Sequence, residues 1–306
     1  METINLNKDL CWLDILSPKK RDVDKLKEIS DFHPLILEEL LLPSDRTKAE
    51  RYKDYLFIVY HLPLYDQIKR SSRRAEIDIL ATKNYLITVH YEELEPINQL
   101  KNQIQNKTPF SPYQVSHYQS TAEILCQLLK ITNEFSQREL KHIEKKTDLV
   151  GEKLFKEQGQ GLLEEISYIK RDILEFSIIT APQRHILESL MQEGIVFWGE
   201  NFRPHFMDLL GDFSRVNYLL ENLRVSIESY SQTVSQILQF KTSEVVRRFS
   251  VLAFLTFPLL IYFTMTLNLE IFKSFAAYPL YYWLTAGFVF ILIIVLAFIF
   301  RKKGWL

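Results

Sequence analysis

Two long apolar runs near the C-terminal end constrain this chain more than any other feature of its sequence. The runs are residues 249–267 and 278–300, and the only charged side chains between their outer ends are Glu270 and Lys273. A helix needs about 20 mainly apolar residues to cross the hydrocarbon core of a bilayer, whereas a buried helix of a soluble domain rarely has more than about 14 without a charge. We therefore predict two transmembrane helices.

Basic residues flank both apolar runs on the side away from the short loop that joins them. They are Lys241, Arg247, Arg248, Arg301, Lys302 and Lys303. The joining loop, residues 268–277, has one Lys and one Glu. Because an excess of Lys and Arg marks the cytoplasmic side of a membrane, we predict a multi-pass protein of the cell membrane, embedded in the lipid bilayer. Both termini are then cytoplasmic, and residues 301–306 form a basic tail.

The first part of the chain, residues 1–110, has the pattern of a cytoplasmic α/β domain. Three segments rich in β-branched and aromatic residues are bounded by turn residues and predict strands: DYLFIVYHLPLYD, AEIDILATKN and YLITVHYEE. Ser17 and Pro18 are typical of the N-cap and first position of a helix, and residues 68–74 predict a polar hairpin turn. Residues 111–203 alternate apolar and charged positions at helical spacing, which predicts a helical region.

A heptad pattern follows Pro204. Its apolar residues recur in alternating steps of three and four over more than four heptads: Phe206, Leu209, Phe213, Val216, Leu220, Leu223, Ile227, Tyr230, Val234 and Ile237. Such a seam indicates a helix that packs along its length, against either its own chain or other copies. No Gly or Pro separates Ile237 from the first apolar run. Residues 204–267 therefore predict one long stalk helix, with residues 249–267 in the membrane.

Four segments match motifs of a known membrane-protein family. They are HPLILEELLLPSDRTKAERYKDYLFIVYHLP, KNYLITVH, KTSEVVRRFSVLAFLTFPLL and the closing FRKKGWL. On these segments and its layout the chain resembles the CorA family of divalent-cation channels, most familiar for magnesium. The resemblance implies an α/β cytoplasmic domain, a helical stalk and two C-terminal transmembrane helices in a CorA-like funnel. It also implies a homopentamer whose five first-span helices line a central pore.

One motif of the family is only partly present. The family has Tyr-Gly-Met-Asn at the outer end of the first span, where this chain has Thr266-Leu267-Asn268, and Asn268 is one residue early when counted from Pro258. In the family this Asn is taken to hold a hydrated magnesium ion. Magnesium gives up its water reluctantly, which suits a ring of neutral amides. Thr266 lacks the backbone freedom of the family's glycine.

Steps of three or four back from Asn268 reach positions that mostly match the family's pore-lining ones. The resemblance implies that Asn268 lines the pore, and helical spacing places Thr264 as a second polar ring below it. Glu270 would form an acidic ring at the entrance, or is a solvated loop residue. The pore gate would consist of Phe257, Phe249, Val246, Leu260 and Ser243, because apolar constrictions can gate by dewetting. The alternatives are ordinary helix packing for the apolar residues and, for Thr264, a hydroxyl bonded to its own helix backbone.

Two further sets of charged residues bear on ion passage. Arg247 and Arg248 would form a basic collar at the cytoplasmic mouth, or would act only as membrane anchors. Asp208 and Asp212 lie one helical turn apart beside the seam and are candidates for a regulatory divalent-metal site, because paired carboxylates can bind magnesium through water. The alternative is a solvated acidic face.

These observations predict a CorA-type channel or transporter for Mg²⁺ or a transition metal such as Co²⁺, Ni²⁺ or Zn²⁺. The divalent cation is its substrate and a possible regulator. Two alternatives are a non-conducting membrane scaffold derived from such a channel and a channel for anions or other non-divalent ions. We expect no enzyme, since the chain has no His-Glu-x-x-His spacing, phosphate-binding Gly-rich loop or nucleophile turn. We also expect no prosthetic group and no nucleic-acid partner.

Overall fold

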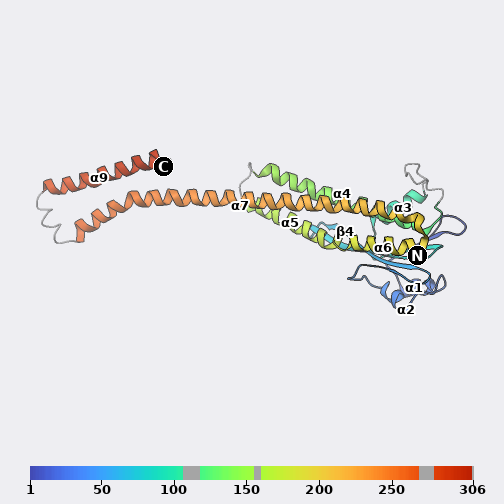
Figure 1. The fold of residues 1–306 in the computed structure, drawn as a ribbon. Helices are drawn as coiled ribbons and strands as arrows, with labels where there is room; N and C mark the ends of the chain where they lie inside the picture. Colours follow the sequence, from blue (N-terminus) through green and yellow to red (C-terminus); the bar gives the residue numbers. More distant parts are fainter. Residues whose placement is uncertain (106–117, 155–159, 269–278, 305–306) are drawn as a thin grey trace. The chain divides into compact units, whose positions relative to one another are not determined.

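A computed structural model describes residues 1–105, 118–154, 160–268 and 279–304 (Figure 1). The chain divides into two compact units, Met1–Ser231 and Gln232–Leu306. The first unit contains a β-sheet and the helices that cover it. The second contains the two apolar helices that the sequence predicts to cross a membrane. One helix, α7 (Arg203–Asn268), belongs to both units.

A mixed sheet forms the centre of the first unit. Among the described residues it has six strands: β1 (Glu2–Asn5), β2 (Cys11–Leu16), β3 (Lys48–Arg51), β4 (Leu56–Asp66), β5 (Ser71–Ala81) and β6 (Tyr85–His90). Their order in space is β1-β2-β6-β5-β4-β3, and only the β2–β6 pair is parallel. Strands β4 and β5 pair along their whole length, from Leu56 opposite Ala81 to Asp66 opposite Ser71.

Strand β4 is buried on both faces, which is why its sequence is an almost continuous apolar run. Phe57 and Val59 point into a core that includes α1 (Lys20–Leu26) and α2 (Pro34–Glu39). Ile58 and Tyr60 point into the opposite core. That second core also contains residues of α3 (Glu95–Gln105), α4 (Thr121–Lys153), α6 (Gln183–Trp198) and α7. The first unit is therefore a three-layer α/β/α domain (Figure 1).

Two local predictions in this domain are wrong. Helix α1 begins at Lys20 with Lys19 as its N-cap, rather than at Ser17 and Pro18. Ser17 instead extends the pairing of β2 with β6, since its backbone N–H donates to the His90 carbonyl at 2.8 Å. It has a left-handed φ of 50°. The predicted turn 68–74 is shorter than expected, because strand β5 already begins at Ser71.

The long helix α7 has 66 residues, which confirms that the seam and the first apolar run share one helix. A short 3₁₀ turn at Glu200–Phe202 precedes it. The seam is buried within a single chain: Phe206, Val216 and Ile227 are at most 2% exposed. The heptad pattern allowed packing either against the same chain or against other copies, and the structure shows that the seam packs against the core of its own chain. The second apolar run forms helix α9 (Pro279–Lys302).

A buried polar network ties β2, β6 and α3 together. His90 Nε2 lies 3.1 Å from Asp14 Oδ2, and Lys101 Nζ lies 2.7 Å from the same oxygen. The Thr88 hydroxyl donates to Asp14, and Trp12 Nε1 donates to Thr88 at 2.9 Å. Burial raises the pKa of Asp14, but the hydrogen bonds and charges of these neighbours outweigh it and bring that pKa below its ordinary value. The carboxylate is thus held ionised inside the domain.

We predict that His90 makes the stability of the domain depend on pH. Burial lowers the His90 pKa, but the hydrogen bond and charge of Asp14 raise it above its ordinary value overall. Its contribution to the free energy of unfolding is therefore complete below about pH 6.5, the ordinary imidazole pKa, and is lost as pH rises through the higher folded-state pKa. The thermal unfolding midpoint of the full chain in detergent should fall between pH 6 and pH 8.

The His90→Gln variant should lower the midpoint and reduce this pH dependence. The expected loss is about 1–3 kcal/mol, because Asp14 then loses a charged partner inside the domain. The matched control is His185→Gln, since the His185 side chain is 84% exposed. An unchanged pH dependence in His90→Gln would contradict the assignment.

Helices α6 and α7 approach each other closely at Gly194. A Cβ atom at this position would lie 2.7 Å from Cζ of Phe206, whose side chain is buried and cannot move aside. We predict that Gly194→Ala lowers the free energy of unfolding by roughly 1–3 kcal/mol through overpacking. Gly211→Ala is the control, because a Cβ at Gly211 in α7 has nothing within 4 Å. Denaturant unfolding should show Gly211→Ala to be neutral or stabilising.

Candidate functional site

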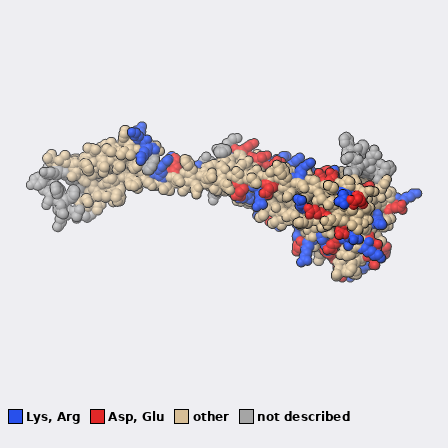
Figure 2. Space-filling model, viewed as in Figure 1, with Lys and Arg blue, Asp and Glu red and all other residues tan. Residues whose placement is uncertain are grey.

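Helices α7 and α9 are long and apolar enough to cross a membrane, by length and composition. Figure 2 shows charged side chains crowded on the first unit and an uncharged surface along most of the second. Among the described residues of this unit, basic side chains lie in α7 before the first apolar run, at Lys241, Arg247 and Arg248, and at the end of α9, at Arg301 and Lys302. The helical extent of both predicted spans thus agrees with the sequence pattern. The loop between them, residues 268–277, lies outside the described residues except for Asn268.

The apolar part of α7 has one partly buried face. Its members recur at helical spacing: Val251, Leu255, Pro258 and Tyr262. Helix α9 has a partly buried face of the same kind, formed by Ala286, Val289, Ile293, Leu296, Ala297 and Phe300. The rings of Phe254 and Phe300 lie 6.3 Å apart. We infer that these two faces pack on each other as a hairpin.

The residues predicted to form the pore gate lie on a different face of α7. Val246, Phe249, Phe257 and Leu260 are between 58% and 68% exposed in the single chain, and Ser243 and Thr264 are exposed as well. At 3.6 residues per turn, the centre of this set lies about 150° around the helix from the partly buried face. Helix α9 therefore leaves the predicted pore face uncovered.

The outer end of α7 is described only in part. The helix continues through Thr266 and Leu267 and ends at Asn268, while the side chains of these residues and all of Glu270 lie outside the described residues. The Thr264 hydroxyl donates to the Leu260 carbonyl at 2.7 Å. In the single chain, the Thr264 hydroxyl is therefore bonded to its own helix backbone, as the alternative interpretation predicted. Its oxygen still has lone pairs that can accept a hydrogen bond from water.

The basic pair at the inner end of α7 is partly compensated. Arg248 Nη2 lies 2.6 Å from Glu244 Oε1, one turn earlier on the same helix. Both Arg247 and Arg248 are exposed. At the inner end of α7, each chain therefore has one ion pair, between Arg248 and Glu244, and one guanidinium, that of Arg247, with no acidic partner among the described residues.

The two acidic residues beside the seam do not assemble a metal site in one chain. Asp208 is exposed and its Oδ2 lies 3.5 Å from Lys130 Nζ, while Asp212 is partly buried one turn further on. The described residues contain no group of three or more His, Cys, Asp or Glu side chains that could hold a metal ion. A regulatory metal site at Asp208 and Asp212 stays a prediction, and it would need ligands from another copy.

Sequence reasoning missed the α9-facing stripe of α7. Every face of this stretch is apolar, so hydrophobicity cannot distinguish a helix-packing face from any other in a membrane. The available signal was the position of Pro258 and Tyr262 on one face, away from the stripe that ends at Asn268.

Comparison with known proteins gives a consistent result. The family model "CorA-like Mg2+ transporter protein" matches residues 7–302. The cobalt/magnesium transport protein CorA of Methanocaldococcus jannaschii is 22% identical over 97% of this chain and 92% of its own length. The protein of the same name from Thermotoga maritima is 20% identical over 81% of this chain and 70% of its own length.

Solved structures have the same fold. The complete structure of the CorA magnesium transporter from Methanocaldococcus jannaschii superposes with a TM-score of 0.82 at 19% identity, covering 100% of this chain and 95% of that one. The full-length CmaX protein gives a TM-score of 0.71 at 13% identity, covering 87% and 80%. The predicted α/β domain, helical stalk and C-terminal apolar helices are therefore confirmed as the fold class. The chain belongs to the CorA family of membrane transport proteins.

Proposed function

We propose that this protein carries divalent metal cations across the cell membrane, with Mg²⁺ as the first candidate and Co²⁺, Ni²⁺ and Zn²⁺ as others. Family membership supports transport as the general function, and relatives in two organisms are named for cobalt and magnesium. Both termini lie in the cytoplasm in this proposal, since the basic flanks of α7 and α9 favour that side.

The observation that carries the proposal is the uncovered face of α7. This face holds Val246, Phe249, Phe257, Leu260 and Thr264 and lies about 150° from the face that packs on α9. Five copies arranged around an axis would turn these faces inward, so that α7 lines a pore and α9 lies outside it. The Phe and Val rings would form apolar constrictions that dewet when closed.

The polar groups suit a cation that keeps its water. A ring of Asn268 amides at the end of α7 would accept hydrogen bonds from the first-shell waters of Mg²⁺, which the ion releases reluctantly. Glu270 rings at the entrance would raise the local cation concentration. At the inner end, the Arg248–Glu244 pair reduces the barrier that a full basic collar would place before a cation. Prosthetic groups have no role in this mechanism.

The second candidate is a non-conducting scaffold derived from such a transporter. It is favoured by the loss of the family's glycine at Thr266 and by the Thr264 hydroxyl, which bonds to its own helix. An anion channel is less well supported, because Glu244 compensates one of the two guanidinium groups in each chain.

We predict that purified protein in liposomes admits Mg²⁺ and that Asn268→Ala lowers this flux about tenfold, equivalent to ~1.4 kcal/mol in the barrier. Thr264→Val should lower it as well, by removing a hydroxyl from the pore face. The control is Thr285→Val, the same substitution in α9, the helix that lies outside the pore in this proposal. An internal fluorescent indicator reports the ion.

The outcomes separate the candidates. Absence of flux for Mg²⁺, Co²⁺, Ni²⁺ and Zn²⁺ at every voltage and pH gradient tested would favour the scaffold. A reversal potential of anionic sign in a salt gradient would favour the anion channel. Equal effects of the Thr264 and Thr285 variants would contradict the assignment of the pore face.

We also predict that Phe257→Ala raises the resting flux several-fold, because it removes an aromatic ring from an apolar constriction. Phe263→Ala is the matched control. Phe263 is an equally exposed Phe, 59% against 63%, but lies about 120° away from Phe257 around α7. Stopped-flow uptake into liposomes compares the two variants, and a larger leak in Phe263→Ala would reverse the proposed orientation of α7.

A further inference from the structure

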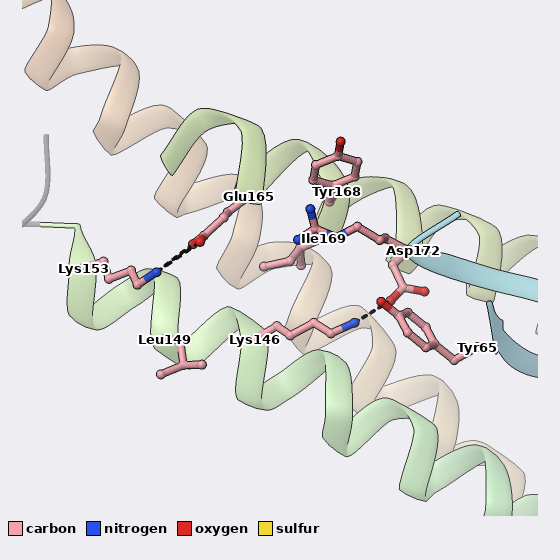
Figure 3. A pocket seen from close by; sticks show the side chains of 9 residues that line it. Tyr65, Lys146, Leu149, Lys153, Glu165, Tyr168, Ile169 and Asp172 are labelled. Carbon is pink, nitrogen blue, oxygen red and sulfur yellow. Dashed lines mark hydrogen bonds and ion pairs between the residues drawn. The ribbon is translucent and has the colours of Figure 1, made fainter. Parts of the chain in front are cut away.

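A cavity of about 170 Å³ lies in the Met1–Ser231 unit, away from the predicted pore. Figure 3 shows it between α4, α5 (Gln160–Thr180) and the end of the β4–β5 hairpin. It is lined by Tyr65, Arg70, Lys146, Leu149, Lys153, Glu165, Tyr168, Ile169 and Asp172. The lining thus combines two aromatic rings and two aliphatic side chains with five charged groups.

The charges of the lining leave an excess of one positive charge. Lys153 Nζ lies 3.1 Å from Glu165 Oε1, and Lys146 Nζ lies 3.6 Å from Asp172 Oδ2 (Figure 3). The third cation, the Arg70 guanidinium, lies over the Tyr168 ring at 4.1 Å from its centre. Among the described residues no carboxylate pairs with Arg70. Since each acid already has its own lysine, Arg70 is the cation that a ligand would neutralise.

Asp172 fixes the position of Lys146 at the base of the cavity. It is 1% exposed, and its Oδ1 accepts from both the backbone N–H and the hydroxyl of Ser72, each at 2.7 Å. Its Oδ2 is buried and accepts no hydrogen bond from the described residues. The Lys146 ammonium lies 3.9 Å from the centre of the Tyr65 ring. One long ion pair and one ring face leave this group with N–H donors to spare.

The backbone at Arg70 also favours a role for its side chain. Arg70 has φ of 54°, a left-handed conformation that glycine adopts at no cost and other L-residues adopt at roughly 1–2 kcal/mol. The turn is held by Asp66, whose Oδ1 accepts from the N–H groups of Ile68 and Lys69. A side chain kept at a strained position that glycine would fill more easily is consistent with a function.

We propose that this cavity binds a small organic anion, with one carboxylate or phosphate group on a short apolar body. The anionic group would lie between Arg70 and Lys146, and the apolar body against Leu149 and Ile169. A water molecule occupies about 30 Å³ of liquid, so the cavity holds the equivalent of about six waters. This is smaller than the roughly 300–1,000 Å³ of drug-sized sites, which restricts the ligand to a metabolite fragment.

Helices α4 and α5, which line the cavity, also contact α7. Next to Leu149 in α4, a Cβ at Gly151 would lie 2.9 Å from the Tyr230 hydroxyl of α7. Next to Ile169 in α5, Lys170 Nζ lies 2.6 Å from Glu228 of α7. An anion that draws α4 and α5 together would change how both hold the end of α7 in this unit. The cavity would therefore regulate transport, a consequence that depends on the proposed function, whereas the binding itself does not.

The experiment uses the full chain in detergent and three probes of one shape: benzoate, neutral benzamide and cationic benzylamine. Isothermal titration calorimetry should show saturable binding of benzoate and a Kd at least about tenfold weaker for the other two. Benzoate should also raise the thermal unfolding midpoint in proportion to its occupancy. Absence of saturable benzoate binding, or equal binding of benzylamine, would overturn the proposal.

Variants locate the binding. Arg70→Gln and Lys146→Gln should each weaken benzoate binding by about tenfold, and using two variants keeps the test valid if one of them fails to fold. Lys69→Gln is the control, because Lys69 belongs to the same turn but does not line the cavity. Wild-type affinity in both lining variants would overturn the assignment to this cavity.

A flux measurement tests the regulatory consequence separately. In liposomes that conduct Mg²⁺, benzoate is added on the side of the membrane that carries the Met1–Ser231 unit. It should change the flux of the wild-type protein and leave the flux of Arg70→Gln unchanged. Benzoate binding without any change in flux would overturn the regulatory role and support the site. A protein that conducts no ion would contradict the proposed function, while the calorimetry would still decide the binding.

Discussion

The burial of one apolar seam holds α7 against the α/β/α domain of the Met1–Ser231 unit. Phe206, Val216 and Ile227 are removed from water against helices of the same chain, and each such side chain contributes about 1.5–3 kcal/mol. The seam closes the second core of the α/β/α domain and fixes the rotation of α7 about its own axis. Within the Met1–Ser231 unit this packing, including the close approach of Gly194 to Phe206, determines which residues of α7 face the core.

The surroundings of α7 change along its length while the helix continues. In the Met1–Ser231 unit the seam is buried, and the opposite side of the helix, which includes Met207, Tyr218 and Val225, is exposed. In the Gln232–Leu306 unit the helix becomes mainly apolar from Phe249 onward, and we infer that the one stripe that is buried or partly buried faces α9. Hydrophobic burial gives no driving force between helices in lipid. The packing of α7 on α9 therefore depends on how closely their surfaces fit. This explains why small residues such as Ala286 and Ala297 occur on the α9 stripe.

The sequence was sufficient where the signal is local and periodic. The two spans, the long helix and the three central strands follow from runs of apolar residues whose period matches one element. It failed where a distant partner decides. Ser17 stays with the sheet because His90 accepts its N–H, and Ser72 is a buried strand residue because Asp172, one hundred positions away, accepts from it. Neither partner is visible in the neighbouring residues.

The candidate site shows the same division. Helical spacing predicted the stripe from Ser243 to Thr264, and the structure leaves that stripe exposed on one side of α7. No spacing rule pointed to the cavity of Tyr65, Lys146 and Asp172, because three separate segments supply its lining. In the proposed pore, selection of the ion at Asn268 would depend on a ring of side chains from several copies, a geometry that one sequence does not contain.

The packing of α9 along a single stripe also affects the range of membranes in which the proposed arrangement can function. Helix α9 is constrained along one stripe only, and the rest of its surface, including Phe288, Phe290 and Phe298, is exposed. Changes on that outer surface alter the length and anchoring of the lipid-facing belt without touching α7. Membranes differ in hydrocarbon thickness by a few ångströms, and a mismatch costs fractions of a kcal/mol per ångström. If α9 lies outside a pore lined by α7, as proposed, variation on its exposed surface would let the protein adapt to a membrane of different thickness while α7 stays the same.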